Sequence, residues 1–253
     1  MIMEAYALKI DILGVSFDDL TLEEAVEAGM ALVHGSEEGA YAVTPNPEFI
    51  LDARKKETFR RDLAGAALTI PDGVGVIYAA KLLGTPLKGK VPGVDFAAGI
   101  MERMAGEGLR LYLLGAKPGV AELAGKNLMG RYPGLTVCGA HDGYFKEEES
   151  AALAAGIRES RADVVFVCLG APKQERWMAA HGAETGARLL VGLGGSLDVF
   201  AGVVERAPER WQKLGLEWLY RLCKEPWRWK RMIRLPLVLW YALLARLGGK
   251  KHG

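Results

Sequence analysis

Asp72 is the carboxylate whose place in the sequence best suits acid–base chemistry. It directly follows the apolar run Ala66–Pro71, so its side chain is expected at the mouth of a pocket, partly removed from water. Loss of water raises the pKa of a carboxyl above its free value of about 3.9 and makes it a better base at neutral pH. The structural alternative is that Asp72 only caps the helix that follows it.

Five further loops place polar or glycine-rich sequence after predicted strands. Three of the six loops hold glycines just before a predicted helix, where backbone N–H groups and the positive helix end can hold phosphate oxygens. Turns in α/β proteins also favour glycine for structural reasons, so no single loop indicates a binding site. The indication of a binding site is that all six loops are expected at one edge of the sheet. In the loop Gly170–Glu175, Lys173 and Gln174 either face a ligand or begin an exposed helix. The five loops are Thr44–Glu48, Gly115–Gly119, His141–Phe145, Gly170–Glu175 and Gly192–Asp198.

Strand-like and helix-like segments alternate through the first 200 residues and must position these loops. The pattern predicts an α/β fold with a largely parallel sheet sandwiched by helices and a basic C-terminal helical appendage. Ligands of such sheets bind beyond the carboxyl ends of the strands. Thr21 and Glu24 form a capping-box pattern at an earlier helix. The expected strands are Ala42–Thr44, Ala67–Ile70, Arg110–Leu114, Leu135–Gly139, Val164–Leu169 and Leu189–Val191. The expected helices are Glu48–Leu63, Val74–Leu83, Phe96–Gly106, Val120–Tyr132, Glu147–Arg158 and Gln174–His181.

Several familiar motifs are absent, which excludes some classes of protein. Gly73-Val-Gly75 and Gly192-Leu-Gly194 both lack the third glycine of a dinucleotide fingerprint, which argues against a Rossmann-type oxidoreductase. There is no P-loop, no HExxH and no GxSxG, and the four histidines are scattered. The three cysteines are widely spaced, so a reducing compartment fits better than a disulfide framework. No Asp-x-Asp follows a strand, so a departing diphosphate would have to be neutralised by fixed cations and helix N-termini.

The last 48 residues differ from the rest in charge and aromatic content. Residues 206–253 carry 12 Lys and Arg against 3 Asp and Glu, whereas residues 1–205 carry 20 against 28. We therefore divide the chain into an α/β body, 1–205, and a basic helical tail, 206–253, in which Pro226 and Pro236 break or kink the helices. Five of the six tryptophans lie in the tail.

A polyanionic partner is expected for this tail, although a solvated helical face is the simpler alternative. Tryptophan and leucine beside Lys and Arg favour an anionic membrane surface over nucleic acid. The longest uncharged run, Leu235–Ala245, has 11 residues against the roughly 20 that span a bilayer. We expect neither a spanning helix nor a signal peptide, and hence a cytoplasmic protein peripheral to the inner face of the plasma membrane.

Taken together, these stretches resemble the WecG/TagA/CpsF glycosyltransferase family, in the family's order and over nearly the whole chain. The matching stretches are TPNPE (44–48), PDGVGV (71–76), VPGVD (91–95), LGAKPG (114–119), DGYF (142–145), LGAPKQE (169–175), GGSLDVFAG (194–202) and RAPERWQKLGLEWLYRL (206–222), followed by EPWRWKR.

The resemblance implies a reaction. It implies an inverting transfer of N-acetylmannosamine from its UDP donor to undecaprenyl-diphosphate-linked N-acetylglucosamine, in cell-surface polymer synthesis and without a metal or cofactor. Asp72 would then be the general base that deprotonates the acceptor hydroxyl. The substrate-binding residues expected from the matching motifs are Thr44, Asn46, Lys90, Gly115, Tyr144, Gln174, Gly194 and Asp198, with Tyr144 and Asp198 at the nucleotide and Gln174 at the sugar.

For the tail, the resemblance implies closure over the site, with Arg221, Arg228 and Arg231 reaching diphosphates. Their spacing places them on one helical face if Pro226 does not turn the later segment away. Lys90 departs from the family, which usually carries arginine there. Lysine keeps the charge and loses the planar fork that binds phosphate in two places.

Some alternatives stay open at this stage. The chain is also compatible with a non-catalytic UDP-sugar-binding peripheral membrane protein, or with a transferase that uses another UDP-N-acetyl sugar. The sequence does not fix the polymer that receives the sugar. A homo-oligomer formed through a groove that the tail uncovers is a further hypothesis.

Overall fold

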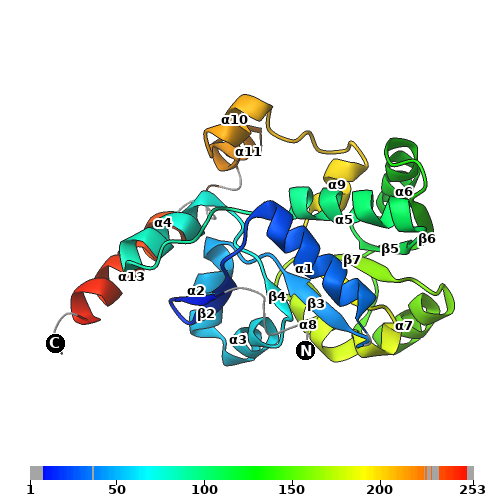
Figure 1. The fold of residues 1–253 in the computed structure, drawn as a ribbon, viewed down its shortest axis with the longest axis horizontal. Coiled ribbons are helices and arrows are strands. Elements are labelled where there is room, and N and C mark those ends of the chain that lie inside the picture. Colours follow the sequence, from blue (N-terminus) through cyan, green and yellow to red (C-terminus); the bar gives the residue numbers. More distant parts are fainter. Residues whose placement is uncertain (1–7, 36, 225, 227–228, 230–233, 250–253) are drawn as a thin grey trace.

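The fold is given by a computed structural model that describes residues 8–35, 37–224, 226, 229 and 234–249. Its main sheet has six parallel strands in the order β4-β3-β8-β7-β5-β6, and a separate antiparallel hairpin pairs β1 with β2. The predicted class, a parallel sheet between helices, is confirmed (Figure 1). The strands are β1 (Lys9–Ile12), β2 (Val15–Asp18), β3 (Ala40–Val43), β4 (Leu68–Thr69), β5 (Arg110–Gly115), β6 (Thr136–His141), β7 (Val164–Cys168) and β8 (Leu189–Gly192).

The helices cover both faces of this sheet and extend beyond it at the C-terminal end. They are α1 (Leu22–His34), α2 (Pro47–Lys55), α3 (Glu57–Ala64), α4 (Val74–Leu83), α5 (Gly93–Glu107), α6 (Val120–Arg131), α7 (Ser150–Glu159), α8 (Lys173–His181), α9 (Ser196–Phe200), α10 (Glu209–Lys213), α11 (Glu217–Lys224) and α13 (Arg234–Gly249). Two short 3₁₀ helices are η2 (Glu147–Glu149) and η3 (Ala183–Thr185).

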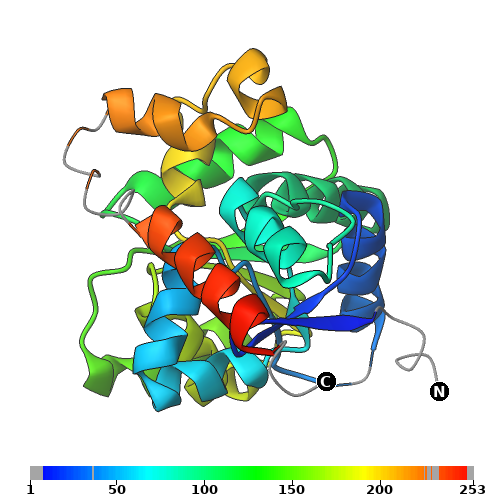
Figure 2. The same ribbon diagram turned by 90° about the vertical axis from the view of Figure 1, so that its left-hand side faces the viewer.

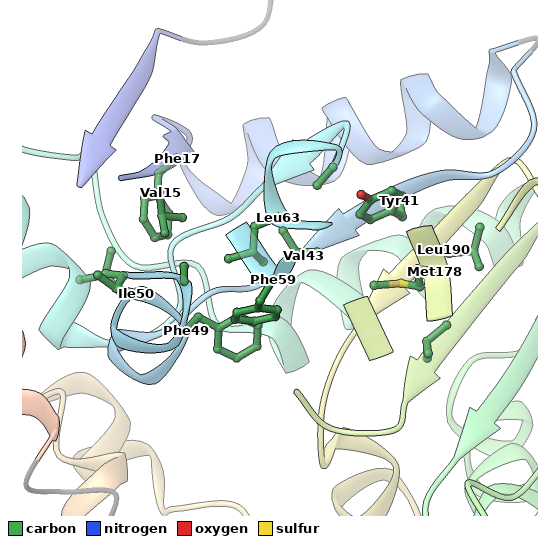
Figure 3. Packing of buried hydrophobic residues seen from close by; sticks show 14 of the residues in the cluster. Val15, Phe17, Tyr41, Val43, Phe49, Ile50, Phe59, Leu63, Met178 and Leu190 are labelled. Atoms are coloured by element: carbon green, nitrogen blue, oxygen red, sulfur yellow. The ribbon is translucent and has the colours of Figure 1, made fainter. Parts of the chain in front are cut away.

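Each face of the sheet has its own hydrophobic core. On one face, α1, α5, α6 and α9 pack on residues such as Leu113 and Phe166. On the other face, the hairpin, α2, α3, α4, α7 and α8 pack on Val43, Val167 and Leu190. Figure 3 shows part of this second core, in which the rings of Phe49 and Phe59 lie 5.6 Å apart. Because helices cover both faces, a ligand can reach the sheet only at its edges and at the ends of its strands.

Three local features differ from the sequence prediction or refine it. The single helix expected over Glu48–Leu63 is wrong, because Lys56 takes an extended conformation and separates α2 from α3. This break lets Phe49 and Phe59 meet as neighbours. The β1–β2 hairpin, turned at Gly14 with φ 91°, was not predicted. The capping box of Thr21 and Glu24 is confirmed, with both reciprocal bonds present at α1.

The C-terminal helices occupy two separate places on the body. Helix α13 lies against α2 and α4, with Val238 and Ala242 fully buried in the core that those helices line (Figure 2). Helices α10 and α11 lie together away from α13. Pro236 stands in the first turn of α13 as described, and residues 230–233 before it lie outside the described residues, so the predicted break or kink at this proline stays a prediction.

Helix α13 keeps an apolar face exposed after this packing. Leu237, Trp240, Leu244 and Leu247 are all more than a third exposed and follow a helical spacing, with Leu243 beside them. Of the helices that the structure describes, none combines the length and apolar character that crossing a bilayer requires.

Candidate active site

The six polar loops predicted from the sequence follow the carboxyl ends of the six parallel strands and therefore lie at one edge of the sheet. Backbone hydrogen bonds join the loops to one another. The N–H of Asp72 donates to the carbonyl of Pro45 at 3.1 Å, and the N–H of Val91 donates to the carbonyl of Pro71 at 2.8 Å. The loop that carries Asp72 is thus held between the Thr44–Glu48 loop and the segment that follows Lys90.

Asp72 lies half-buried directly before α4. The N-cap residue of that helix is Gly73, whose φ of 91° is a conformation that favours glycine. Asp72 is therefore not the N-cap residue, although it takes part in a polar contact of its own. Its carboxylate stands at the carboxyl edge of β4, where the sequence placed it.

Thr44, Gln174 and Gly194 meet around the end of β8. The hydroxyl of Thr44 donates to the carbonyl of Gly192 at 3.0 Å, and the N–H of Gly194 donates to Oε1 of Gln174 at 3.0 Å. A Cβ at Gly192 would lie 2.9 Å from Nε2 of Gln174, so a larger residue there would displace that amide. Gln174 is 1% exposed, so its amide supports the turn at Gly194 from inside the protein.

Asn46 begins α2 as its cap. Its Oδ1 accepts the N–H of Glu48 at 2.8 Å and that of Phe49 at 3.4 Å. This contact accounts for an asparagine before Pro47 on structural grounds. Its predicted contact with substrate stays a prediction.

The loops after β5, β6 and β7 are also fastened together. Gly115 approaches β7 so closely that a Cβ there would lie 2.3 Å from the carbonyl oxygen of Cys168. Gly143 donates its N–H to the carbonyl of Ala116, and Lys173 donates to the carbonyl of Gly143 at 2.9 Å. The next residue, Tyr144, is 72% exposed and so presents its ring to solvent on a fixed loop.

Asp198 lies in the short helix α9, which follows Gly194 and Gly195. Its side chain is half-buried, and its carbonyl accepts the N–H groups of Val203 and Val204. These bonds fold the chain back after α9. The side chain thus sits at the same sheet edge as Gly194, and its predicted contact with the nucleotide stays a prediction.

Lys90 and Arg206 connect the C-terminal segment to the body. Lys90 lies 3.3 Å from Oε2 of Glu217 in α11 and donates to the carbonyl of Gln212. Arg206 binds both carboxylate oxygens of Asp95, at 2.6 and 2.8 Å, and reaches Glu217 at 3.4 Å. Asp95 raises the pKa of Arg206 further, so this guanidinium stays charged.

A pocket of about 240 Å³ opens where Lys90 faces α4 and the turn between α10 and α11. One cation and mostly apolar walls give it an amphipathic lining. The lining residues are Val74, Ile77, Tyr78, Lys90, Leu214 and Gly215.

The three arginines expected in the tail are not placed by the structure. Arg221 belongs to α11, but its side chain lies outside what is described, and Arg228 and Arg231 lie outside the described residues altogether. Among the described residues, no group of three or more His, Cys, Asp or Glu side chains is arranged to hold a metal ion.

Four site-forming residues were missed by sequence reasoning. Asp95, Arg206 and Glu217 form an ion-pair group across more than 100 residues of chain, a distance over which charge pairing carries no sequence signal. Glu175 is fully buried, although its surroundings, KQER, read as an exposed helix start.

The fold and the candidate site define an α/β protein in which six polar loops, one of them carrying Asp72, lie at the carboxyl edge of a parallel sheet. Residues 10–252 match the glycosyl transferase WecG/TagA/CpsF family, and the chain belongs to this family. The predicted resemblance is confirmed.

Two curated relatives cover most of the chain. It is 36% identical over 198 residues to the N-acetylglucosaminyldiphosphoundecaprenol N-acetyl-beta-D-mannosaminyltransferase of Bacillus spizizenii strain W23, covering 78% of this chain and 76% of the relative. It is 34% identical over 228 residues to the protein of the same name from Staphylococcus aureus strain MW2, covering 90% of this chain and 88% of the relative.

Proposed function

We propose that this protein transfers N-acetylmannosamine from UDP-N-acetylmannosamine to undecaprenyl-diphosphate-linked N-acetylglucosamine, as the names of its relatives state for them. Family membership over nearly the whole chain supports a glycosyl transfer. The observation that carries the proposal is the placement of Asp72, a half-buried carboxylate on a loop hydrogen-bonded to the Thr44 loop and joined through Pro71 to the Lys90 segment.

Asp72 acts as the general base of this reaction. Its carboxylate takes the proton of the acceptor hydroxyl while the hydroxyl oxygen attacks C1 of the donor sugar. The bond from C1 to the UDP oxygen breaks in the same displacement, so the anomeric centre is inverted and UDP leaves with the electron pair. A positioned base contributes about 10²–10⁴-fold to such a step.

The donor binds along the loops after β5, β6, β7 and β8. Tyr144 offers an exposed ring to the nucleotide, and Asp198 offers a carboxylate near the glycine turn at Gly194. Gly115 keeps the neighbouring loop close to β7. Thr44 and Asn46 line the sugar end, while Gln174 fixes the turn that the sugar meets.

Cations on the C-terminal side of the site neutralise the charge of the diphosphate. Lys90 lines the amphipathic pocket beside α4, and its charge suits a phosphate at the head of an apolar chain. Arg221, Arg228 and Arg231 supply further positive charge when the tail lies over the site.

Attachment to an anionic membrane surface follows from the same acceptor, because its lipid chain lies in a bilayer. The exposed apolar face of α13, with Trp240 at its centre, suits the boundary between headgroups and acyl chains. These features support attachment at the inner face of the plasma membrane as the proposed location. Cosedimentation with anionic vesicles should weaken with salt, whereas Trp240→Ser together with Leu244→Ser should abolish it; unchanged binding of that variant would exclude α13 as the attachment.

The test of function is UDP release from UDP-N-acetylmannosamine with and without a short-chain lipid-diphosphate-N-acetylglucosamine acceptor. Acceptor-dependent release is expected. Release only from another UDP-N-acetyl sugar would show that the donor is that sugar and not UDP-N-acetylmannosamine. Binding of UDP-sugars without release from any of them would show that the protein is a UDP-sugar-binding protein and not a transferase.

A further inference from the structure

Glu175 of α8 is a carboxyl group that lies wholly inside the protein, with 0% of its surface exposed. Its Oε1 accepts a hydrogen bond from Nε2 of Gln174 at 2.5 Å. Its Oε2 is buried without a hydrogen-bond partner in the described part of the chain. A buried ionisable group with one unpaired oxygen costs stability that a leucine would not, so its presence indicates a role other than stability.

The orientation of the Gln174 amide, and therefore its contact with Glu175, follows from the hydrogen bond between Gln174 and Gly194. Because the backbone N–H of Gly194 can only donate, the atom of Gln174 that receives it must be the amide oxygen. The amide nitrogen then has to face Glu175. A chain of two bonds therefore runs from the core carboxyl through Gln174 to the turn that begins α9.

The far end of this chain is the candidate donor site. The same turn is held from the other side by Thr44, whose hydroxyl donates to the carbonyl of Gly192. A shift of Gln174 would therefore move Gly192–Gly194 against Thr44.

We propose that Glu175 is a positioning residue that sets, through Gln174, the place of the Gly192–Gly194 turn at the donor-binding edge. The link between Glu175 and the turn stands on the contacts alone. Its effect on turnover rests on the proposed function, because that function assigns the turn to the sugar-nucleotide site.

The ionisation of Glu175 gives this brace a pH dependence. Burial raises the pKa of Glu175 to about 7, the bond from Gln174 lowers it, and the nearby charge of Asp62 raises it. Tyr41 of β3 and Asp62 of α3 both interact electrostatically with Glu175. Burial raises the pKa of Asp62, and the charge of Arg176 of α8 lowers it. Ionised Glu175 makes a charge-assisted bond to Gln174, which protonation weakens, so the turn is held best above pH 7.

The experiment compares the wild-type chain with Glu175→Gln, which keeps an acceptor oxygen and the side-chain size but does not ionise. The first readout is the NMR shift of the Gly194 amide and of the Gln174 side-chain NH₂ from pH 5.5 to 8.5. The second is the pH profile of kcat/KM for UDP release. Glu184→Gln removes a charge from η3, away from Gln174, and is the matched control.

In the wild-type chain and in Glu184→Gln, both NMR signals should titrate with a midpoint near 7. Their kcat/KM should fall about tenfold below that midpoint, because small misplacements in a site carry costs of this order. Glu175→Gln should lose both titrations, and its kcat/KM at pH 8 should lie about tenfold below that of the wild type, because a neutral amide cannot form the charge-assisted bond to Gln174. Asp62→Asn should move the wild-type midpoint to lower pH.

Two results would overturn the proposal: a Gly194 signal that titrates unchanged in Glu175→Gln, or a kcat/KM profile that Glu175→Gln leaves unaltered. A chain that turns over no UDP-sugar, yet loses the Gly194 titration on Glu175→Gln, would refute the proposed function and keep the link from Glu175 to the turn. Normal turnover with a pH-independent Gly194 signal would refute the role of Glu175 alone.

Discussion

The two sides of the candidate site are held together by different physics. On the β8 side, Gln174 and Glu175 form a buried hydrogen-bonded chain to Gly194. On the side of the C-terminal segment, Lys90 and Arg206 hold Glu217 through ion pairs whose side chains are 22–26% exposed. Buried hydrogen bonds respond to protonation and little to salt, whereas partly exposed ion pairs are screened by salt. One side of the site should therefore respond to pH and the other to salt concentration.

Asp72 stands between these two sides, and its removal should cost more activity than a change to either. Asp72→Asn should lower kcat by about 10²–10⁴-fold, because a general base is lost while the shape of the loop is kept. UDP binding, measured by calorimetry, should stay close to that of the wild type. Near-normal turnover in this variant would remove Asp72 from the mechanism.

The buried side should reveal itself in the pH dependence of stability. The pKa of Glu175 is raised from 4.5 to about 7 in the folded protein. A carboxyl with a raised folded pKa contributes stability that is fully present below pH 4.5 and is lost as pH rises through about 7. The wild-type chain should therefore lose about 3 kcal/mol of unfolding free energy over this range relative to Glu175→Gln. Urea unfolding at pH 5 and pH 8 measures the difference, and parallel pH dependences of the two proteins would contradict it.

The side of the C-terminal segment should reveal itself through Arg206. Arg206→Ala leaves the carboxylates of Asp95 and Glu217 close together without their shared cation. We expect a loss of about 1–3 kcal/mol in unfolding free energy from the unpaired groups. Exposed Arg210, substituted by alanine, is the control and should change little. Equal effects of the two substitutions in urea unfolding would rule out a special role for the Arg206–Asp95 pair.

The smallest effect is expected from Glu217→Gln, which weakens the contacts of α11 with Lys90 and Arg206. A partly exposed ion pair contributes about 0.2–1 kcal/mol, so the melting temperature should drop by about 1–3 °C in low salt. In 0.5 M salt the drop should shrink, because the charges of the wild-type pair are screened. A drop that is the same at both salt concentrations would show that packing, and not charge, holds α11.

Much of the framework could be predicted from the sequence because its signals are local. All six strands of the parallel sheet and the exact limits of α4, Val74–Leu83, follow from apolar runs and from turn residues. The β1–β2 hairpin was missed, although Gly14 and the alternation around it are typical of one. The break at Lys56 carries no proline or glycine, and it depends on the packing of Phe49 against Phe59.

The candidate site was predicted in part for the same reason. The loop of Asp72 and the turn at Gly194 follow directly from strand ends. The burial of Glu175 depends on how α8 meets α3 and the sheet, which a single sequence does not reveal. The pairing of Arg206 with Asp95 likewise arises only when the chain folds back on itself. Local pattern thus predicts where a site lies, and tertiary packing decides which charges support it.

The most direct test of this account is UDP release from UDP-N-acetylmannosamine by the full chain in the presence of lipid, with and without the lipid-diphosphate-N-acetylglucosamine acceptor. Release should depend on the acceptor and should fall by about 10²–10⁴-fold in Asp72→Asn. Acceptor-dependent release that Asp72→Asn leaves intact, or no release at all with the tail intact, would contradict it.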